Sequence, residues 1–220
     1  MKFAWHLFLG MLCMPSSGAD WPSVPSPRHS KVQQIGEQVR LNGVPMRMQR
    51  VLSTGKPTDI IEFYRAALGP KHAEEKLPGG LLLAQGQGDH FVTIRIKVLG
   101  LSFTETLISV SDARGAQNAA GRPLGFPIPM ETQVLSDMES TDAGKMSRQL
   151  VLTNSHSIDY NVDFAIKTLL ARGFKAQPNE TRELKAGRVL TFGGDNREAQ
   201  LVVIRKDGTS NVVLTTVQMP

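Results

Sequence analysis

Two segments of this chain, residues 36–112 and 131–220, carry the same order of predicted secondary-structure elements. Short matches between them occur at an offset that grows along the chain. Val51-Leu52-Ser53 aligns with Val151-Leu152-Thr153, and Ile94-Arg95 aligns with Ile204-Arg205. The insertions fall between predicted elements, as expected for a duplicated supersecondary unit. The pattern therefore predicts a tandem repeat, and two unrelated α+β domains are the alternative that so few identities leave open.

Each repeat is predicted to contain two strands, one helix and three further strands. Asn42-Gly43 lies between the extended segments 38–41 and 44–52 and is typical of a type I′ hairpin turn. Three extended segments separated by short turns follow each predicted helix, at 81–85, 90–98, 102–111, 188–192, 199–205 and 211–218. Connections this short require antiparallel neighbours. The predicted fold class is α+β, a tandem repeat of two ββαβββ units, each an antiparallel sheet with one helix packed on it.

The helix limits follow from capping signals. Pro57 is suited to the first position of a helix, and Gly69-Pro70 is a typical helix end. In the second repeat Ser157 is a predicted N-cap, and Gly173 ends the helix.

Alternation within two strands predicts which side chains are buried. Met46 and Met48 alternate with polar side chains, so their face is expected to pack on the core. In segment 90–98 the apolar set includes Ile94, whereas Arg95 and Lys97 point to the other face and are expected to meet solvent or a partner.

The first nineteen residues have the pattern of a secretory signal peptide. Lys2 precedes an apolar run at 3–14, and the small residues Ser17 and Ala19 fit a cleavage site near Ala19. The run is shorter than the roughly 20 residues that a membrane-spanning helix needs. Cleavage would also remove Cys13, the one cysteine, and leave a chain without disulfides. We therefore expect a bacterial protein that is periplasmic or secreted.

Two segments outside the repeats are predicted to lack regular structure. Residues 20–35 form a Pro-rich extended arm that is expected to be mobile, and residues 113–130 form a Gly/Ala/Pro-rich linker. Phe126 and Ile128 are unusual in a free linker. They either dock in a groove between the repeats or on a partner, or simply cover the edge of a core.

The charge distribution argues against a nucleic-acid partner. The chain has a formal net charge of +5, but residues 36–112 carry 9 basic and 8 acidic residues, and residues 131–220 carry 11 of each. A nucleic-acid-binding protein concentrates basic residues on a folded face. The excess lies instead in Lys2, the arm and the linker. In the arm and the linker it suits loose contact with an anionic envelope surface or ordinary solvation.

No local motif in the sequence indicates catalysis. The histidines are isolated, a Gly-x-Ser-x-Gly elbow is absent, and neither Gly79-Gly80 nor Gly193-Gly194 is followed by the Lys and Ser or Thr of a P-loop. Glu74-Glu75 is expected in a solvated loop after the first helix. We therefore predict no catalytic residue, no cofactor and no metal site.

These observations favour an exported, non-catalytic binding or assembly module of the bacterial cell envelope. Such a module could act as an accessory protein of a secretion or pilus system. Its expected partner is an envelope protein or peptide. The candidate partner-binding residues are Arg95, Lys97, Phe126, Ile128 and Arg205.

Two alternatives place a site between the repeats. A hydrolase-type enzyme would need Asp89, His90 or Arg95 to approach His156, Asp195 or Arg205 in a concave pocket. A small-ligand carrier would need an unfilled cavity.

Overall fold

One antiparallel sheet runs through the whole described chain. The computed structural model describes residues 21–119 and 121–219, so the predicted signal peptide lies outside the described residues. The described part is α+β, with a 13-stranded sheet and three α-helices. Within it, no helix combines the length and apolar character that crossing a membrane would require.

The first half of the chain, as far as it is described, contains six strands and the helix α1. In chain order its elements are β1 (Ser30–Leu41), β2 (Val44–Thr54), α1 (Pro57–Leu68), β3 (Ala73–Leu77), β4 (Gly80–Gln87), β5 (His90–Gly100) and β6 (Phe103–Asp112). The helix α2 (Ala113–Ala119) then leads into the connecting segment.

The second half repeats this order with one more short strand. Its elements are β7 (Gln133–Asp142), β8 (Lys145–Asn154), α3 (Ile158–Ala171), β9 (Lys175–Ala176), the 3-10 turn η1 (Pro178–Glu180), β10 (Arg182–Leu184), β11 (Gly187–Gly194), β12 (Arg197–Lys206) and β13 (Thr209–Gln218).

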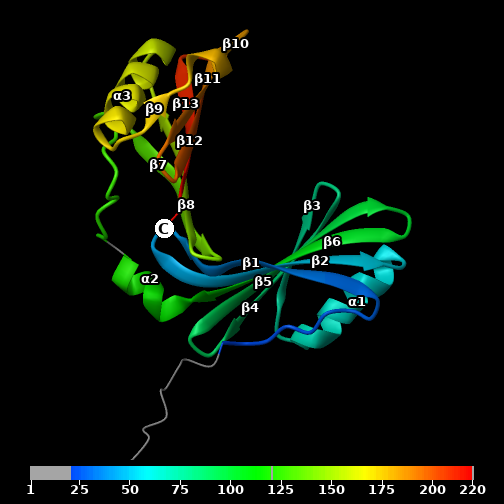
Figure 1. Cartoon of the computed structure of the whole chain (residues 1–220). Coiled ribbons are helices and arrows are strands. Elements are labelled where there is room, and N and C mark those ends of the chain that lie inside the picture. Colours follow the sequence, from blue (N-terminus) through cyan, green and yellow to red (C-terminus); the bar gives the residue numbers. More distant parts are fainter. Residues whose placement is uncertain (1–20, 120, 220) are drawn as a thin grey trace, which may run out of the picture.

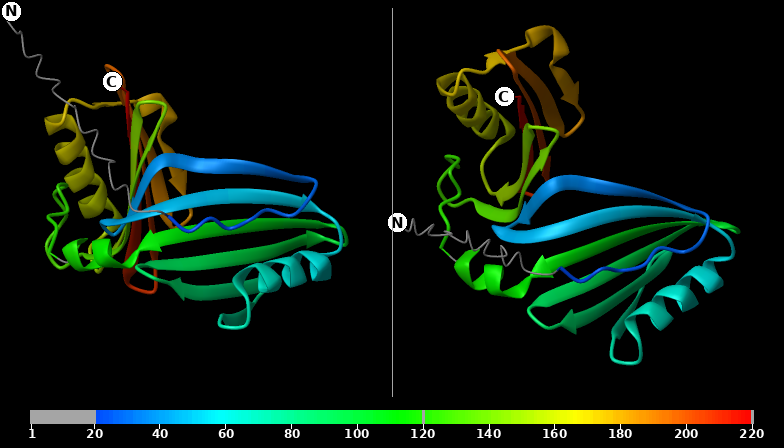
Figure 2. Two further views of the ribbon diagram at one scale, coloured as in Figure 1. Left: turned by 90° about the horizontal axis from the view of Figure 1, so that it is seen from below. Right: turned by 60° about the horizontal axis from the view of Figure 1, so that its bottom comes forward.

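The strand order is β10-β11-β12-β13-β8-β7-β1-β2-β6-β5-β4-β3, with β9 beside β11. The two halves are therefore joined edge to edge through β1 and β7. Only four residue pairs form that ladder, from Gln38 opposite Thr141 to Leu41 opposite Met138. Figure 1 and Figure 2 show that the two parts of the sheet are steeply inclined to each other at this joint.

The predicted turn and caps are confirmed. Asn42 and Gly43 both have positive φ, 51° and 79°, as the type I′ hairpin between β1 and β2 requires. Helix α1 begins at Pro57 and ends before Gly69. The Ser157 side chain accepts a hydrogen bond from the backbone N–H of Tyr160, so it caps α3 as expected.

Several predicted details of the units are wrong. Four strands follow α1, because the segment that contains Glu74-Glu75 is the edge strand β3 rather than a loop. Five strands follow α3, and the two halves share one sheet rather than forming two. The first part of segment 113–130, predicted as a linker, forms the helix α2.

The segment expected to be a mobile arm lies against the first half. β1 begins at Ser30, eight residues before the predicted strand. Val24 is buried, and Trp21 packs against the first core and contacts the ring of His90, with centroids 4.9 Å apart. The guanidinium of Arg47 lies 5.0 Å from the Trp21 ring centroid. Proline excludes helix here but does not prevent packing.

The buried face of β2 is opposite to the one predicted. Val51 and Ser53 are fully buried under α1, and alternation puts Arg47 and Gln49 on the same face. Gln49 donates to the Val24 carbonyl, so the arm covers the polar end of this face. Met46 and Met48 lie on the other side of the sheet.

Each core lies between one helix and one half of the sheet. In the second half a cross-strand row of four leucines, Leu190, Leu201, Leu214 and Leu150, packs against the α3 stripe of Val162, Ala165 and Leu169. In the first half Leu83, Ile94 and Ile108 form the matching row beneath Ile60, Tyr64 and Leu68 of α1. Burial of these apolar side chains is the main force that holds each helix on its sheet.

Candidate functional site

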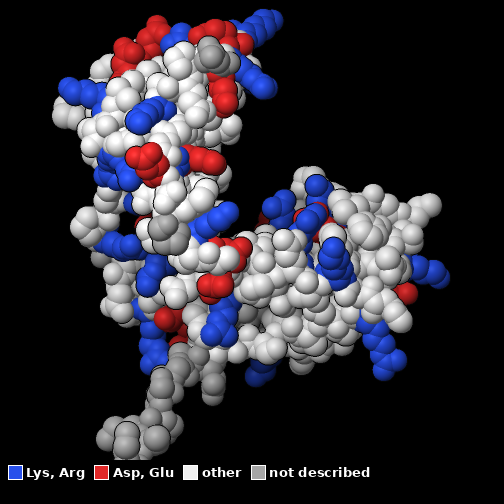
Figure 3. Space-filling view, viewed as in Figure 1, with Lys and Arg blue, Asp and Glu red and all other residues white. Residues whose placement is uncertain are grey.

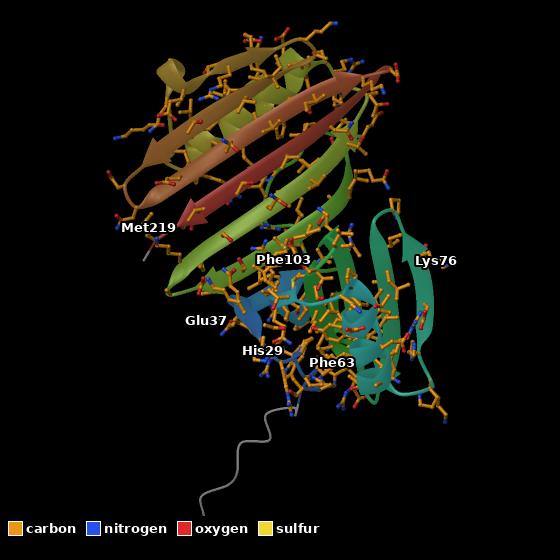
Figure 4. All side chains as sticks on the ribbon, turned by 90° about the vertical axis from the view of Figure 1, so that its right-hand side faces the viewer. His29, Glu37, Phe63, Lys76, Phe103 and Met219 are labelled. Carbon is orange, nitrogen blue, oxygen red and sulfur yellow. The ribbon has the colours of Figure 1, made fainter. Side chains whose placement is uncertain are left out.

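Each half of the sheet has one face that no helix of the described residues covers, which we call its open face. In Figure 1, α1 lies below the first half and α3 lies to the left of the second half. The open faces therefore border the space between the halves, and Figure 3 shows that the molecular surface is hollowed there. Figure 4 labels Phe103 on the side of the first half that faces the second, and Phe63 on the α1 side.

The open face of the second half carries a row of valines. Val189 pairs with Val202, Val202 with Val213, and Val213 with Val151, so four valines cross four adjacent strands. Ile204, which is exposed, extends this apolar surface along β12. The solvated face of an antiparallel sheet is normally polar, so the valine row indicates a surface suited to contact.

The open face of the first half combines apolar and basic side chains. Arg95 of β5 pairs with Leu82 and with Leu107, and Lys97 pairs with Glu105. Arg95 and Lys97 are both exposed, as predicted from the alternation.

Only part of the charge on this face is neutralised. The Arg50 guanidinium donates to the Glu105 carboxylate at 2.9 Å. That hydrogen bond lowers the pKa of Glu105 and raises the pKa of Arg50. Arg95 has no ion pair among the described residues, so it is free to meet an acidic group.

A pocket of about 340 Å³ lies at the junction of the two halves. Four arginines and one acidic residue line it: Arg40, Arg122, Arg148, Arg172 and Glu139. Its apolar lining comes from Phe126, Met146 and Phe174. We call it the junction pocket, because its walls come from β1, the connecting segment, β7, β8, β13 and the residues that follow α3.

Two of the four arginines in the junction pocket are neutralised. Arg148 donates from Nε and Nη2 to both oxygens of Asp137, at 2.8 and 2.7 Å, and this fork raises the pKa of Arg148. Arg122 donates to Glu139 at 3.0 Å, and Arg148 lies 3.7 Å from the same carboxylate. Two carboxylates thus hold two guanidinium groups.

Phe126 and Ile128 cover the edge of the second core, which is the simpler of their two predicted roles. The Arg172 guanidinium lies 4.7 Å from the Phe126 ring centroid and donates to the Gly125 carbonyl at 2.8 Å. Phe126 also lines the junction pocket, so its ring has a second, accessible contact surface.

Arg205 holds the loop before α3 in place. Its Nη1 donates to the carbonyls of Ser155 and His156 and to the hydroxyl of Ser210. These contacts use the guanidinium within the second half, so the structure gives Arg205 a local structural role.

The residues of the predicted enzyme site are not brought together. Asp89 pairs with Arg114 and His90 contacts Trp21, both within the first half and the segment just after it. The His156 ring donates from Nε2 to the Met130 carbonyl, and it lies 4.4 Å from the Tyr160 ring, centroid to centroid. No hydrogen bond or ion pair of the described residues joins the two sets, and the described residues hold no group of three metal-ligating side chains.

The junction pocket was not predicted from the sequence. Its arginines come from positions far apart in the chain, and no local motif links them.

The chain matches no family model, no curated protein and no solved structure at a significant level.

Proposed function

We propose that this protein is an exported, non-catalytic binding or assembly module of the bacterial cell envelope, which docks an envelope protein between its two open faces. The observation that carries the proposal is the valine row on the open face of the second half. A role accessory to a secretion or pilus system is consistent with it. Export itself rests on the signal-peptide pattern of residues 1–19.

The valine row argues for a partner because solvation of apolar surface is unfavourable. The four valines lie on the face away from α3, with the leucine row at the neighbouring positions on the other face. A sheet with a polar solvent face would place Thr, Lys or Glu at these positions. A partner that covered the valine row would gain binding free energy of roughly 25 cal/mol for each Å² of apolar surface removed from water.

The first half indicates the charge of the partner. Arg95 and Lys97 are exposed on its open face beside Leu82 and Leu107. We infer a partner segment that has both apolar and acidic side chains, because such a segment would complement the two open faces.

We further propose that the two halves are a tandem repeat. The strand order β1-β2-β6-β5-β4-β3 of the first half has the same pattern as β7-β8-β13-β12-β11-β10 of the second. Helices α1 and α3 follow the second strand of each half. A duplication would explain why two similar open faces adjoin one hollow.

Site-specific photocrosslinking in the native host tests the docking surface. A photoreactive amino acid is placed at Val202 or Arg95 on the open faces and, as a control, at Lys167 on the outer side of α3. We expect one adduct of the same size from positions 202 and 95 and none from 167. Val213→Asp should abolish the adduct from position 95.

Two results would contradict the proposal. One is crosslinking from position 167 as strong as from the open faces. The other is an adduct that survives Val213→Asp in a folded protein.

A small-ligand carrier is a second candidate, which the junction pocket favours.

A further inference from the structure

We infer that the junction pocket binds an amphiphilic anion, a carboxylate or phosphate head group on a short apolar body. This site is separate from the open faces and goes beyond the proposed docking function. The inference rests on two unneutralised guanidinium groups beside an apolar wall.

Arg40 and Arg172 provide the head-group site. Arg40 lies on β1 directly opposite Glu139 of β7, yet Glu139 is held by Arg122 and Arg148. Within residues 21–119 and 121–219, Arg40 makes one weak hydrogen bond, 3.4 Å to the Gly43 carbonyl, and no ion pair.

Arg172 is also without an acidic partner in that part of the chain. It donates one hydrogen bond, to the Gly125 carbonyl, and lies over Phe126. A guanidinium group presents several N–H donors in a planar fork that matches carboxylate and phosphate oxygens. Two such forks at one pocket leave a positive charge that an anion would neutralise.

The apolar body would lie against Phe126, Phe174 and Met146. Phe174 is buried on the second core, whereas Met146 at the start of β8 is 56% exposed, which is high for a methionine beside a pocket. Methionine adapts its shape to apolar ligands. The volume of about 340 Å³ lies at the lower end of the range for ligand pockets, so the body is short.

The ligand would contact both halves at once. Arg40 belongs to the first half, whereas Arg172 and Phe174 follow α3 in the second half. A molecule that binds the folded junction and not the unfolded chain stabilises the fold by mass action.

Calorimetric titration of the purified protein with four probes tests the site. The probes are decanoate, decyl phosphate, decanol and inorganic phosphate. We expect decanoate or decyl phosphate to bind at least tenfold more tightly than decanol, since decanol lacks the charge that the arginines attract, and more tightly than phosphate, which lacks the apolar body. The stronger of the two anions identifies the head group. Affinity should fall as salt rises.

Charge-neutral variants locate the site. Arg40→Gln should weaken binding of the preferred anion by about tenfold, the effect of losing one charge-assisted hydrogen bond. Arg40 makes one weak contact, so this variant should fold normally, and thermal unfolding checks it. Arg172→Gln should act in the same direction. Arg182→Gln, which removes an exposed arginine of β10 outside both the pocket and the open-face sites, is the matched control.

The inference is wrong if neither anion binds, if decanol binds as tightly as decanoate and decyl phosphate do, or if Arg40→Gln weakens binding of the preferred anion no more than Arg182→Gln does. Because the open faces lie elsewhere, loss of photocrosslinking at Val202 does not bear on this site.

Discussion

Asn42 and Asp137 clamp the two halves of the protein together. The backbone N–H of Asn42 donates to the Asp137 carbonyl at 2.7 Å, and the Asn42 side-chain oxygen accepts from the Asp137 N–H at 2.9 Å. The Asp137 carboxylate in turn holds Arg148, which lines the junction pocket. One reciprocal pair therefore extends the four-pair ladder between β1 and β7 and adjoins the pocket.

Loss of the Asn42 side chain should destabilise the junction. Asn42→Gly keeps the positive φ that the turn needs but removes one hydrogen bond, so we expect a loss of about 0.5–1.5 kcal/mol in the free energy of unfolding. Asn42→Ala should cost about 1 kcal/mol more, because alanine disfavours positive φ. Urea denaturation measures both.

Asp207→Gly is the control for Asn42→Gly. Asp207 has φ 49° in the turn between β12 and β13, away from the junction. Equal effects of the two glycine variants would mean that the clamp contributes no stability.

Substitutions on the two faces of β12 should lower the free energy of unfolding by different amounts. Leu201 is fully buried under α3, so Leu201→Ala should cost about 2–5 kcal/mol through lost burial and a cavity. Val202, the next residue, lies on the open face, and Val202→Thr should cost less than about 1.5 kcal/mol. Thermal unfolding compares them, and a larger loss from Val202→Thr would reverse the assignment of the faces.

Tyr64 should ionise only at strongly alkaline pH. Burial of its hydroxyl raises its pKa to about 12, although the neighbouring Thr106 hydroxyl opposes the shift. Since the folded pKa exceeds the unfolded value of about 10, stability is complete below about pH 10 and falls as the pH rises to about 12.

The Tyr64 pKa is measurable in one variant. Tyr64 and Tyr160 are the two tyrosines of the chain, so Tyr160→Phe leaves Tyr64 alone for ultraviolet titration. A midpoint near 12 in the native protein, and near 10 in guanidinium chloride, is the expected pair of results. A native midpoint near 10 would show that the hydroxyl is hydrated.

An ion-pair cluster should make the edge strand β3 sensitive to pH. Arg65 donates to both oxygens of Glu74, and His72 lies 2.9 Å from the same carboxylate. Arg65 and His72 lower the pKa of Glu74 to about 2, and Glu74 raises the pKa of His72. The Glu74 contribution is lost as the pH falls from about 4.5 to 2, and the His72 contribution is lost as the pH rises above about 6.5.

NMR titration of the His72 ring tests the cluster. Glu74→Gln should lower the His72 pKa, whereas Glu75→Gln, a neighbouring exposed carboxylate, should leave it unchanged. An equal shift in both variants would indicate general surface charge rather than this contact.

Local features of the fold were predictable because neighbouring residues determine them. Backbone conformation within a few residues decides three of these features. They are the positive φ at Asn42-Gly43, the start of α1 at Pro57 and the cap of α3 at Ser157. Alternation also predicted burial of Ile94 and exposure of Arg95 correctly. The predicted buried face of β2 was wrong, because alternation separates the two faces of a strand but does not say which of them another segment covers.

The sequence by itself determined the α+β class, the helices α1 and α3 with the hairpin before each, and the turns, through hydrophobic period and capping chemistry; it did not reveal the short strands β3, β9 and β10. The tertiary structure alone decided that β1 pairs with β7, that Trp21 and Val24 cover part of the first core, and that Arg40 shares a pocket with Arg172. These features join residues far apart in the chain, up to 132 positions for the two arginines, and no short-range propensity encodes such contacts. They form because separate apolar surfaces and strand edges find their most favourable pairing in the folded chain.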